Sequence, residues 1–150
     1  MSKYVWLDMD GTIADLYAVN GWLDDLLAYK TRPYEQAKAM YDTIELLETL
    51  ADLKAKGYKL GVISWGSKTG NLIYNRQVEA VKRNWLAERG LDLLLDKIIV
   101  TPYGVCKADT CRQYGEGVLV DDELPNRQAW DLGITIDAKC NILTELRKLR

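Results

Sequence analysis

Two aspartates, Asp8 and Asp10, have the residue type and spacing that carboxylate chemistry needs. They follow a short apolar run, residues 4–7, which predicts a buried strand. Residues two apart on an extended chain project to the same side, so both carboxylates should face one site where the strand ends. Two carboxylates so close raise each other's pKa unless a cation lies beside them. The alternative without chemistry is a polar turn, because Gly11 lets the backbone turn away at once.

The elements that must position these aspartates alternate along the 150 residues. Four further apolar runs predict strands, at 58–63, 97–100, 118–120 and 134–136. Apolar spacing and capping residues predict helices at 13–30, 34–56, 75–89, 107–114, 125–132 and 139–149. We expect Asn20-Gly21 to interrupt the first of these. This alternation is typical of the α/β class, with a mainly parallel sheet between two helical layers. We expect one domain that spans residues 1–150.

Polar residues follow three of the predicted strands, at the edge where ligands of such sheets bind. Ser64 follows the second strand, and Asp121 and Asp122 follow the fourth. With the first pair of aspartates, four carboxylates would then converge, and uncompensated burial of even one costs on the order of several kcal/mol. The site therefore implies a divalent cation, and oxygen-only ligands favour Mg²⁺. Lys107, at the start of the preceding helix, would help to neutralise a phosphoryl group.

The composition excludes several classes of function. A formal net charge of -2 provides no basic field for long nucleic acids. The chain has no His, which excludes His-based triads and His-ligated zinc, so acid–base chemistry must come from carboxylate, Lys, Tyr or Cys. Three Cys without zinc spacing favour reduced thiols and a cytoplasmic location. We expect no signal peptide and no membrane span.

In their order and strand context, these residues resemble the four motifs of haloacid dehalogenase (HAD) superfamily phosphohydrolases. Residues 8–12, Asp-Met-Asp-Gly-Thr, are similar to the first motif, Ser64 to the second and Lys107 to the third. Asp121 and Asp122 are similar to the fourth. The resemblance covers nearly the whole chain, and it implies a Rossmann-like three-layer sandwich that catalyses Mg²⁺-dependent phosphoryl transfer.

The resemblance also implies a role for each carboxylate. Asp8 would be the nucleophile that forms an aspartyl-phosphate. Asp10 would protonate the leaving oxygen and then activate water, and its presence favours a phosphatase over a dehalogenase. Asp8, the carbonyl group of Asp10 and Asp121 would hold the Mg²⁺ ion, with Asp122 assisting through water.

Two features depart from the usual pattern of this family. Trp65 stands where a small or polar residue is more common, so we expect it beside the phosphate with Ser64 and Lys107. Residues 13–32 leave room for at most a small helical cap. The apolar residues of this segment form either the core of the cap, which we favour, or a wall that faces the substrate: Leu16, Trp22, Leu23 and Leu26.

The motifs and the Trp residues also indicate a class of substrate. The first and last motifs resemble those of small 5′-nucleotidases, and Trp22 or Trp65 could stack on a nucleobase, so we expect a nucleoside monophosphate. The loop that begins at Ser64 and a helix with Arg83 and Trp85 resemble the 3′-phosphatase domain of polynucleotide kinase-phosphatases. A polynucleotide end is therefore an alternative substrate. A phosphoprotein phosphatase and a non-catalytic phosphoryl-binding module also remain open.

Overall fold

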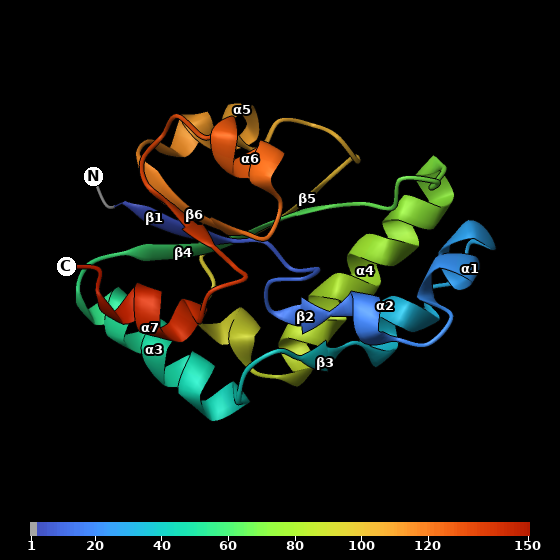
Figure 1. The fold of residues 1–150 in the computed structure, drawn as a ribbon, viewed down its shortest axis with the longest axis horizontal. Coiled ribbons are helices and arrows are strands. Elements are labelled where there is room, and N and C mark those ends of the chain that lie inside the picture. The colour runs from blue at the N-terminus through green and yellow to red at the C-terminus, as the bar shows by residue number, and fades with distance from the viewer. Residues whose placement is uncertain (1–2) are drawn as a thin grey trace.

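The computed structural model describes residues 3–150, and its centre is a five-stranded parallel sheet with the strand order β5-β4-β1-β6-β7 (Figure 1). The strands are β1 (Tyr4–Leu7), β4 (Lys59–Trp65), β5 (Lys97–Thr101), β6 (Gly117–Asp121) and β7 (Thr135–Asp137). An antiparallel pair, β2 (Ala14–Asp15) and β3 (Lys38–Ala39), lies outside this sheet. Because β1 is the central strand, the residues that follow it lie in the middle of the carboxyl edge.

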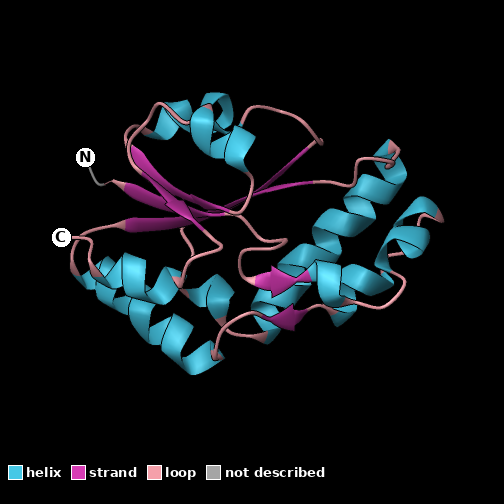
Figure 2. Ribbon diagram, in the orientation of Figure 1, coloured by secondary structure: helices cyan, strands magenta, loops and turns pink. Residues whose placement is uncertain are grey.

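Helices cover both faces of the sheet (Figure 2). One layer contains α3 (Thr43–Ala55), α4 (Leu72–Glu88) and α7 (Ile142–Arg147), and the other contains α5 (Lys107–Cys111) and α6 (Leu124–Gln128). The remaining helices are α1 (Trp22–Leu27), α2 (Arg32–Gln36), η1 (Leu16–Ala18), η2 (Leu91–Leu93) and η3 (Arg112–Tyr114). This arrangement confirms the predicted α/β class and the Rossmann-like three-layer sandwich. Within residues 3–150, no helix has the length and apolarity needed to cross a membrane.

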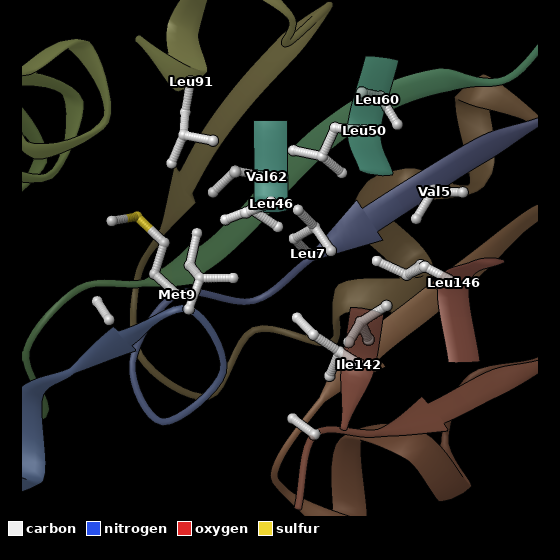
Figure 3. Close-up of a cluster of buried hydrophobic side chains, with 14 of the residues drawn as sticks. Val5, Leu7, Met9, Leu46, Leu50, Leu60, Val62, Leu91, Ile142 and Leu146 are labelled. Carbon is white, nitrogen blue, oxygen red and sulfur yellow. The ribbon is translucent and has the colours of Figure 1, made fainter. Parts of the chain in front are cut away.

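Side chains of β1 alternate between the two layers, as a sheet covered on both faces requires. Tyr4 and Trp6 pack on one side, whereas Val5 and Leu7 belong to the larger cluster on the other. Figure 3 shows that cluster, in which the strand residues meet Leu46 and Leu50 of α3 and Ile142 and Leu146 of α7. The end of β1 is therefore held between two packed layers.

The helix predicted at 13–30 is wrong before its expected interruption at Asn20-Gly21, after which α1 begins. The backbone N–H groups of Thr12, Ile13 and Ala14 all donate to the Met9 carbonyl, each at 3.0 Å, and this tight turn leads into β2 and η1. Only α1 is helical as expected. The apolar residues of this stretch are too irregularly spaced to distinguish short elements from one frayed helix.

The continuous helix predicted at 34–56 is also wrong. The chain leaves α2 at Ala37, forms β3, and starts a new helix at Thr43. The start of α3 has a local signal, because the Asp42 side chain accepts a hydrogen bond from the Glu45 N–H at 3.0 Å. Ala37 precedes α3, yet its side chain is buried in the same core cluster as Leu46 and Leu50 of that helix.

The chain between β2 and β3 forms a small unit, which we call the 14–39 segment. Its buried residues Leu16, Leu26 and Tyr34 pack against Tyr74 and Val78 of α4. The pairing of β2 with β3 carries this unit past the expected boundary at residue 32. Figure 1 shows that the strands of the main sheet point towards it, so it lies near their carboxyl ends.

Candidate active site

A cavity of about 510 Å³ lies at the carboxyl ends of β1, β4 and β6. Asp8, Asp10, Trp65, Lys107 and Asp122 line its sheet side. Residues of the 14–39 segment line the opposite side. Five of the seven residues predicted for the site therefore border one cavity, at the edge where ligands bind in folds of this type.

Asp8 is fixed at the centre of this edge. Its N–H donates to the Val120 carbonyl at 2.9 Å, and its two carboxylate oxygens accept from Lys107 Nζ at 2.8 Å and Thr12 Oγ1 at 3.1 Å. Lys107 also donates to Asp121 Oδ2 at 2.7 Å. Burial alone lowers the pKa of Lys107, but the Asp8 and Asp121 carboxylates outweigh it and raise the pKa. Lys107 is thus a permanent cation between two aspartates.

Asp8, Asp121 and Asp122 form a cluster suited to a metal ion. Each offers a carboxylate oxygen, and these oxygens lie within 4.8 Å of one another. Among residues 3–150, the buried Oδ1 of Asp122 has no hydrogen-bond partner. Burial, together with the charge of Asp8, raises the pKa of Asp122 to about 8. An oxygen-only donor set that includes an unpartnered carboxylate oxygen fits a hard divalent cation such as Mg²⁺.

The raised pKa of Asp122 predicts how stability depends on pH and Mg²⁺. Between its unfolded pKa, about 4, and its folded pKa, the folded state binds more protons, so the metal-free protein should lose stability as pH rises towards 8. Metal binding requires the ionised carboxylates. We therefore expect Mg²⁺ to raise Tm more at about pH 8.5 than at about pH 6.

Thermal melts in EDTA and in Mg²⁺, at matched ionic strength, measure this effect. In Asp122→Asn the fall in Tm with pH should be shallower and the response to Mg²⁺ smaller. A wild-type Tm that responds to Mg²⁺ no more than to monovalent salt would contradict the metal site.

Asp10 has a partner that the sequence analysis missed. Its Oδ2 accepts from Lys82 Nζ at 2.9 Å, and the Lys82 side chain is only 1% exposed. Burial raises the pKa of Asp10, and Lys82 offsets this only in part. A sequence signal was present, because Lys82 lies four residues after Val78 and three before Trp85, on the apolar face of α4.

The four carboxylates of the site now have two buried ammonium groups among them. Lys107 compensates Asp8 and Asp121, and Lys82 compensates Asp10. About two negative charges remain uncompensated when all four aspartates are ionised, which is the charge of one divalent cation. The electrostatics of the cluster therefore agree with the geometry of the metal ligands.

Of the three residues predicted to bind phosphate, two line the cavity and one does not. Trp65 and Lys107 line the cavity, and Lys107 Nζ lies 5.3 Å from the centroid of the Trp65 ring. Ser64 is buried within β4 instead of lying in a loop, and its hydroxyl accepts from Lys82 Nζ at 2.7 Å. Ser64 does not line the cavity, since the strand continues through Trp65 and pairs with β5.

The opposite wall of the cavity is apolar and aromatic. Leu16 and Leu26 are in the core of the 14–39 segment, whereas Leu23 is 51% exposed. Trp22 packs on that core and also lines the cavity, with its ring centroid 5.0 Å from that of Tyr17. The two interpretations of these residues, segment core and cavity wall, therefore both apply.

Arg83 and Trp85, which suggested a polynucleotide phosphatase, do not line this cavity. The Trp85 indole is buried and donates to the Ala37 carbonyl at 2.7 Å. Arg83 is exposed on α4 and donates to the Ile98 carbonyl at 2.8 Å. That part of the resemblance therefore reflects the packing of α4 and not the site.

Two crystal structures have the same fold over the whole chain. The D,D-heptose 1,7-bisphosphate phosphatase from Burkholderia thailandensis matches with a TM-score of 0.58 and 13% identity, covering 99% of this chain and 100% of that one. The D,D-heptose 1,7-bisphosphate phosphatase from B. bronchiseptica, complexed with magnesium and phosphate, matches with a TM-score of 0.56 and 14% identity, covering 97% and 98%. The chain thus has the fold of these two phosphatases. Neither a protein-family model nor a curated protein sequence matches it.

Proposed function

We propose that this chain is a Mg²⁺-dependent phosphomonoesterase of the HAD type, with Asp8 as its nucleophile. One observation carries the proposal: Asp8 and Asp10 line the same cavity, and each is paired with a buried lysine. A carboxylate that is ionised at neutral pH attacks phosphorus without an activating base. A non-catalytic phosphoryl-binding module would have no use for the second aspartate.

The reaction follows from these two carboxylates. A carboxylate oxygen of Asp8 forms a bond to phosphorus, the bond from phosphorus to the leaving oxygen breaks, and Asp10 gives its proton to that oxygen. Water then attacks the phosphorus of the aspartyl-phosphate, Asp10 takes a proton from the water, and the bond between phosphorus and the Asp8 oxygen breaks. Inorganic phosphate leaves, and both aspartates return to their starting forms.

The other residues orient and neutralise these groups. Thr12 and Lys107 fix the Asp8 carboxylate, and the Lys107 ammonium also balances charge on the phosphoryl oxygens. The ligands for Mg²⁺ would be Asp8, Asp121 and the Asp10 carbonyl, with Asp122 beside them. When bound, Mg²⁺ neutralises the carboxylates and the phosphoryl charge.

The cavity favours a nucleoside monophosphate as the substrate. Trp22 and Tyr17 form an aromatic wall on the 14–39 segment, and Trp65 packs beside Tyr103, with ring centroids 4.8 Å apart, on the sheet side. Stacking of a base on such rings stabilises binding by about 1–3 kcal/mol. The 14–39 segment would serve as the small cap that closes over this base.

A panel of phosphomonoesters tests the proposal. With Mg²⁺, we expect kcat/KM for 5′-mononucleotides to exceed that for glucose 6-phosphate, a heptose bisphosphate and a phosphopeptide. Trp22→Ala should lower kcat/KM for nucleotides about tenfold and leave that for sugar phosphates nearly unchanged. Leu93→Ala, an exposed residue outside the cavity, is the control.

Other outcomes of the panel identify other substrates. A preference for a 3′-phosphorylated oligonucleotide that disappears with added salt would favour the polynucleotide alternative. Equal rates on nucleotides and sugar phosphates, unchanged in Trp22→Ala, would remove the stacking argument. No Mg²⁺-dependent hydrolysis of any phosphomonoester would contradict the proposed activity.

A further inference from the structure

Lys82 is a lysine that α4 carries into the interior of the protein. Its ammonium group has three protons and three acceptors: Asp10 Oδ2 at 2.9 Å, Ser64 Oγ at 2.7 Å and the Trp65 carbonyl at 2.7 Å. The ring of Tyr34, from the 14–39 segment, lies 5.0 Å from Nζ. A buried ammonium group is costly unless every proton is bonded, and here each one is.

These contacts join the ends of two neighbouring strands. Asp10 belongs to the turn after β1, whereas Ser64 and Trp65 are the last two residues of β4. Lys82 reaches both from a helix that packs on the sheet, so one side chain links Asp10 to the end of β4. An apolar side chain of the same length would fill the space, but it would hold neither the carboxylate nor the hydroxyl.

Only one oxygen of Asp10 is bound by Lys82. Among residues 3–150, no hydrogen bond is made by Oδ1, and the Asp10 side chain is 18% exposed and borders the cavity. A carboxylate held by one oxygen has a fixed rotamer and keeps the other oxygen available for proton transfer. General acid–base catalysis needs such a fixed geometry, within hydrogen-bond reach of the reacting oxygen.

We propose that Lys82 is a positioning residue, which orients Asp10 as the proton donor to the leaving group. The inference rests on the proposed phosphatase function and deepens it. Lys82 does not line the cavity, whereas Asp10 and Tyr34, which both contact its ammonium group, do. It acts on the chemical step through Asp10.

A series of leaving groups tests this role. The experiment measures kcat/KM of wild type and Lys82→Met for aryl phosphates with increasingly basic phenols and for a 5′-mononucleotide. p-Nitrophenolate departs without a proton, whereas an alkoxide needs one. Lys82→Met should therefore change kcat/KM little for p-nitrophenyl phosphate and lower it about ten- to a hundredfold for the nucleotide.

Three comparisons make the result specific. Asp10→Asn should show the same steeper dependence on leaving-group basicity. Arg83→Met removes the neighbouring exposed cation on α4. Its slope, the change of log kcat/KM with the basicity of the leaving group, should equal that of the wild type. If Lys82→Met does not fold, as judged by near-UV circular dichroism, Lys82→Gln replaces it. The Gln side chain is shorter than that of Lys, but its amide group keeps two N–H donors.

The outcomes separate this inference from the function on which it rests. A steeper slope in the Lys82 variants supports the positioning role. An equal loss for all substrates, with the slope unchanged in an active enzyme, overturns it, because general structural damage acts on every substrate alike. A wild type that hydrolyses no phosphomonoester contradicts the proposed function, and the role of Lys82 fails with it.

Discussion

Replacing Asp8 by Asn should lower kcat for Mg²⁺-dependent phosphate release on the order of 10⁴-fold or more, with the fold retained. The Asn amide has almost the same shape as the carboxylate, so Thr12 and Lys107 keep a partner. The amide oxygen, however, is too weak a nucleophile to form the phosphoryl intermediate. Steady-state rates with a 5′-mononucleotide, together with thermal melts, measure both parts of this prediction.

Asp92→Asn provides the matched control, because it makes the same chemical change at an exposed position outside the cavity. Its rate should equal that of the wild type. Activity of Asp8→Asn within tenfold of the wild type would contradict the nucleophilic role of Asp8.

Lys107→Met should have the largest effect on stability. The Lys107 side chain is 2% exposed, and its removal leaves the buried carboxylates of Asp8 and Asp121 without their shared cation. Breaking a buried ion pair in this way costs about 3–5 kcal/mol. We expect urea unfolding in EDTA at about pH 8 to show a loss of this size, and saturating Mg²⁺ to recover part of it.

Lys148→Met is the comparison for this variant. Lys148 pairs with Glu145 on the surface at 3.0 Å, where ion pairs contribute about 0–1 kcal/mol. Equal loss of stability in the two variants, measured in EDTA, would show that Lys107 does not compensate a buried charge cluster.

The central sheet was predictable because its strands are buried on both faces. Continuous apolar runs such as residues 4–7 and 118–120 have few alternatives in an α/β chain. Because the carboxyl ends of parallel strands share one edge, Asp8, Lys107 and Asp122 were expected to lie together, and all three line one cavity. These parts depend on burial and topology, which the pattern of the sequence records directly.

The 14–39 segment was not predictable to the same degree. Its elements are short, and strands such as Ala14–Asp15 and Lys38–Ala39 form because they pair with each other across the segment, which no local pattern reports. Trp22 could not be assigned to core or wall, because it does both. In such stretches tertiary contacts decide the structure more than local propensity does.

Lys82 was missed for a related reason. A lysine on an amphipathic helix is normally at the surface, and only its acceptors, from two separate strand ends, explain its burial. Ser64 was placed in a loop because a polar residue after an apolar run usually marks a strand end. In the structure it stays in the strand, since Lys82 satisfies its hydroxyl.

The most direct test of the central claim is to trap the phosphoryl group on the enzyme. Asp10→Asn is mixed with p-nitrophenyl phosphate and Mg²⁺, quenched in acid, reduced with borohydride and analysed by peptide mass spectrometry. The first step needs no proton for this leaving group, but the second needs the base, so the aspartyl-phosphate should accumulate. The account predicts that Asp8 is recovered as homoserine, the product of reducing an acyl phosphate. Release of p-nitrophenol with Asp8 unmodified, or with the phosphoryl group on another residue, would contradict it.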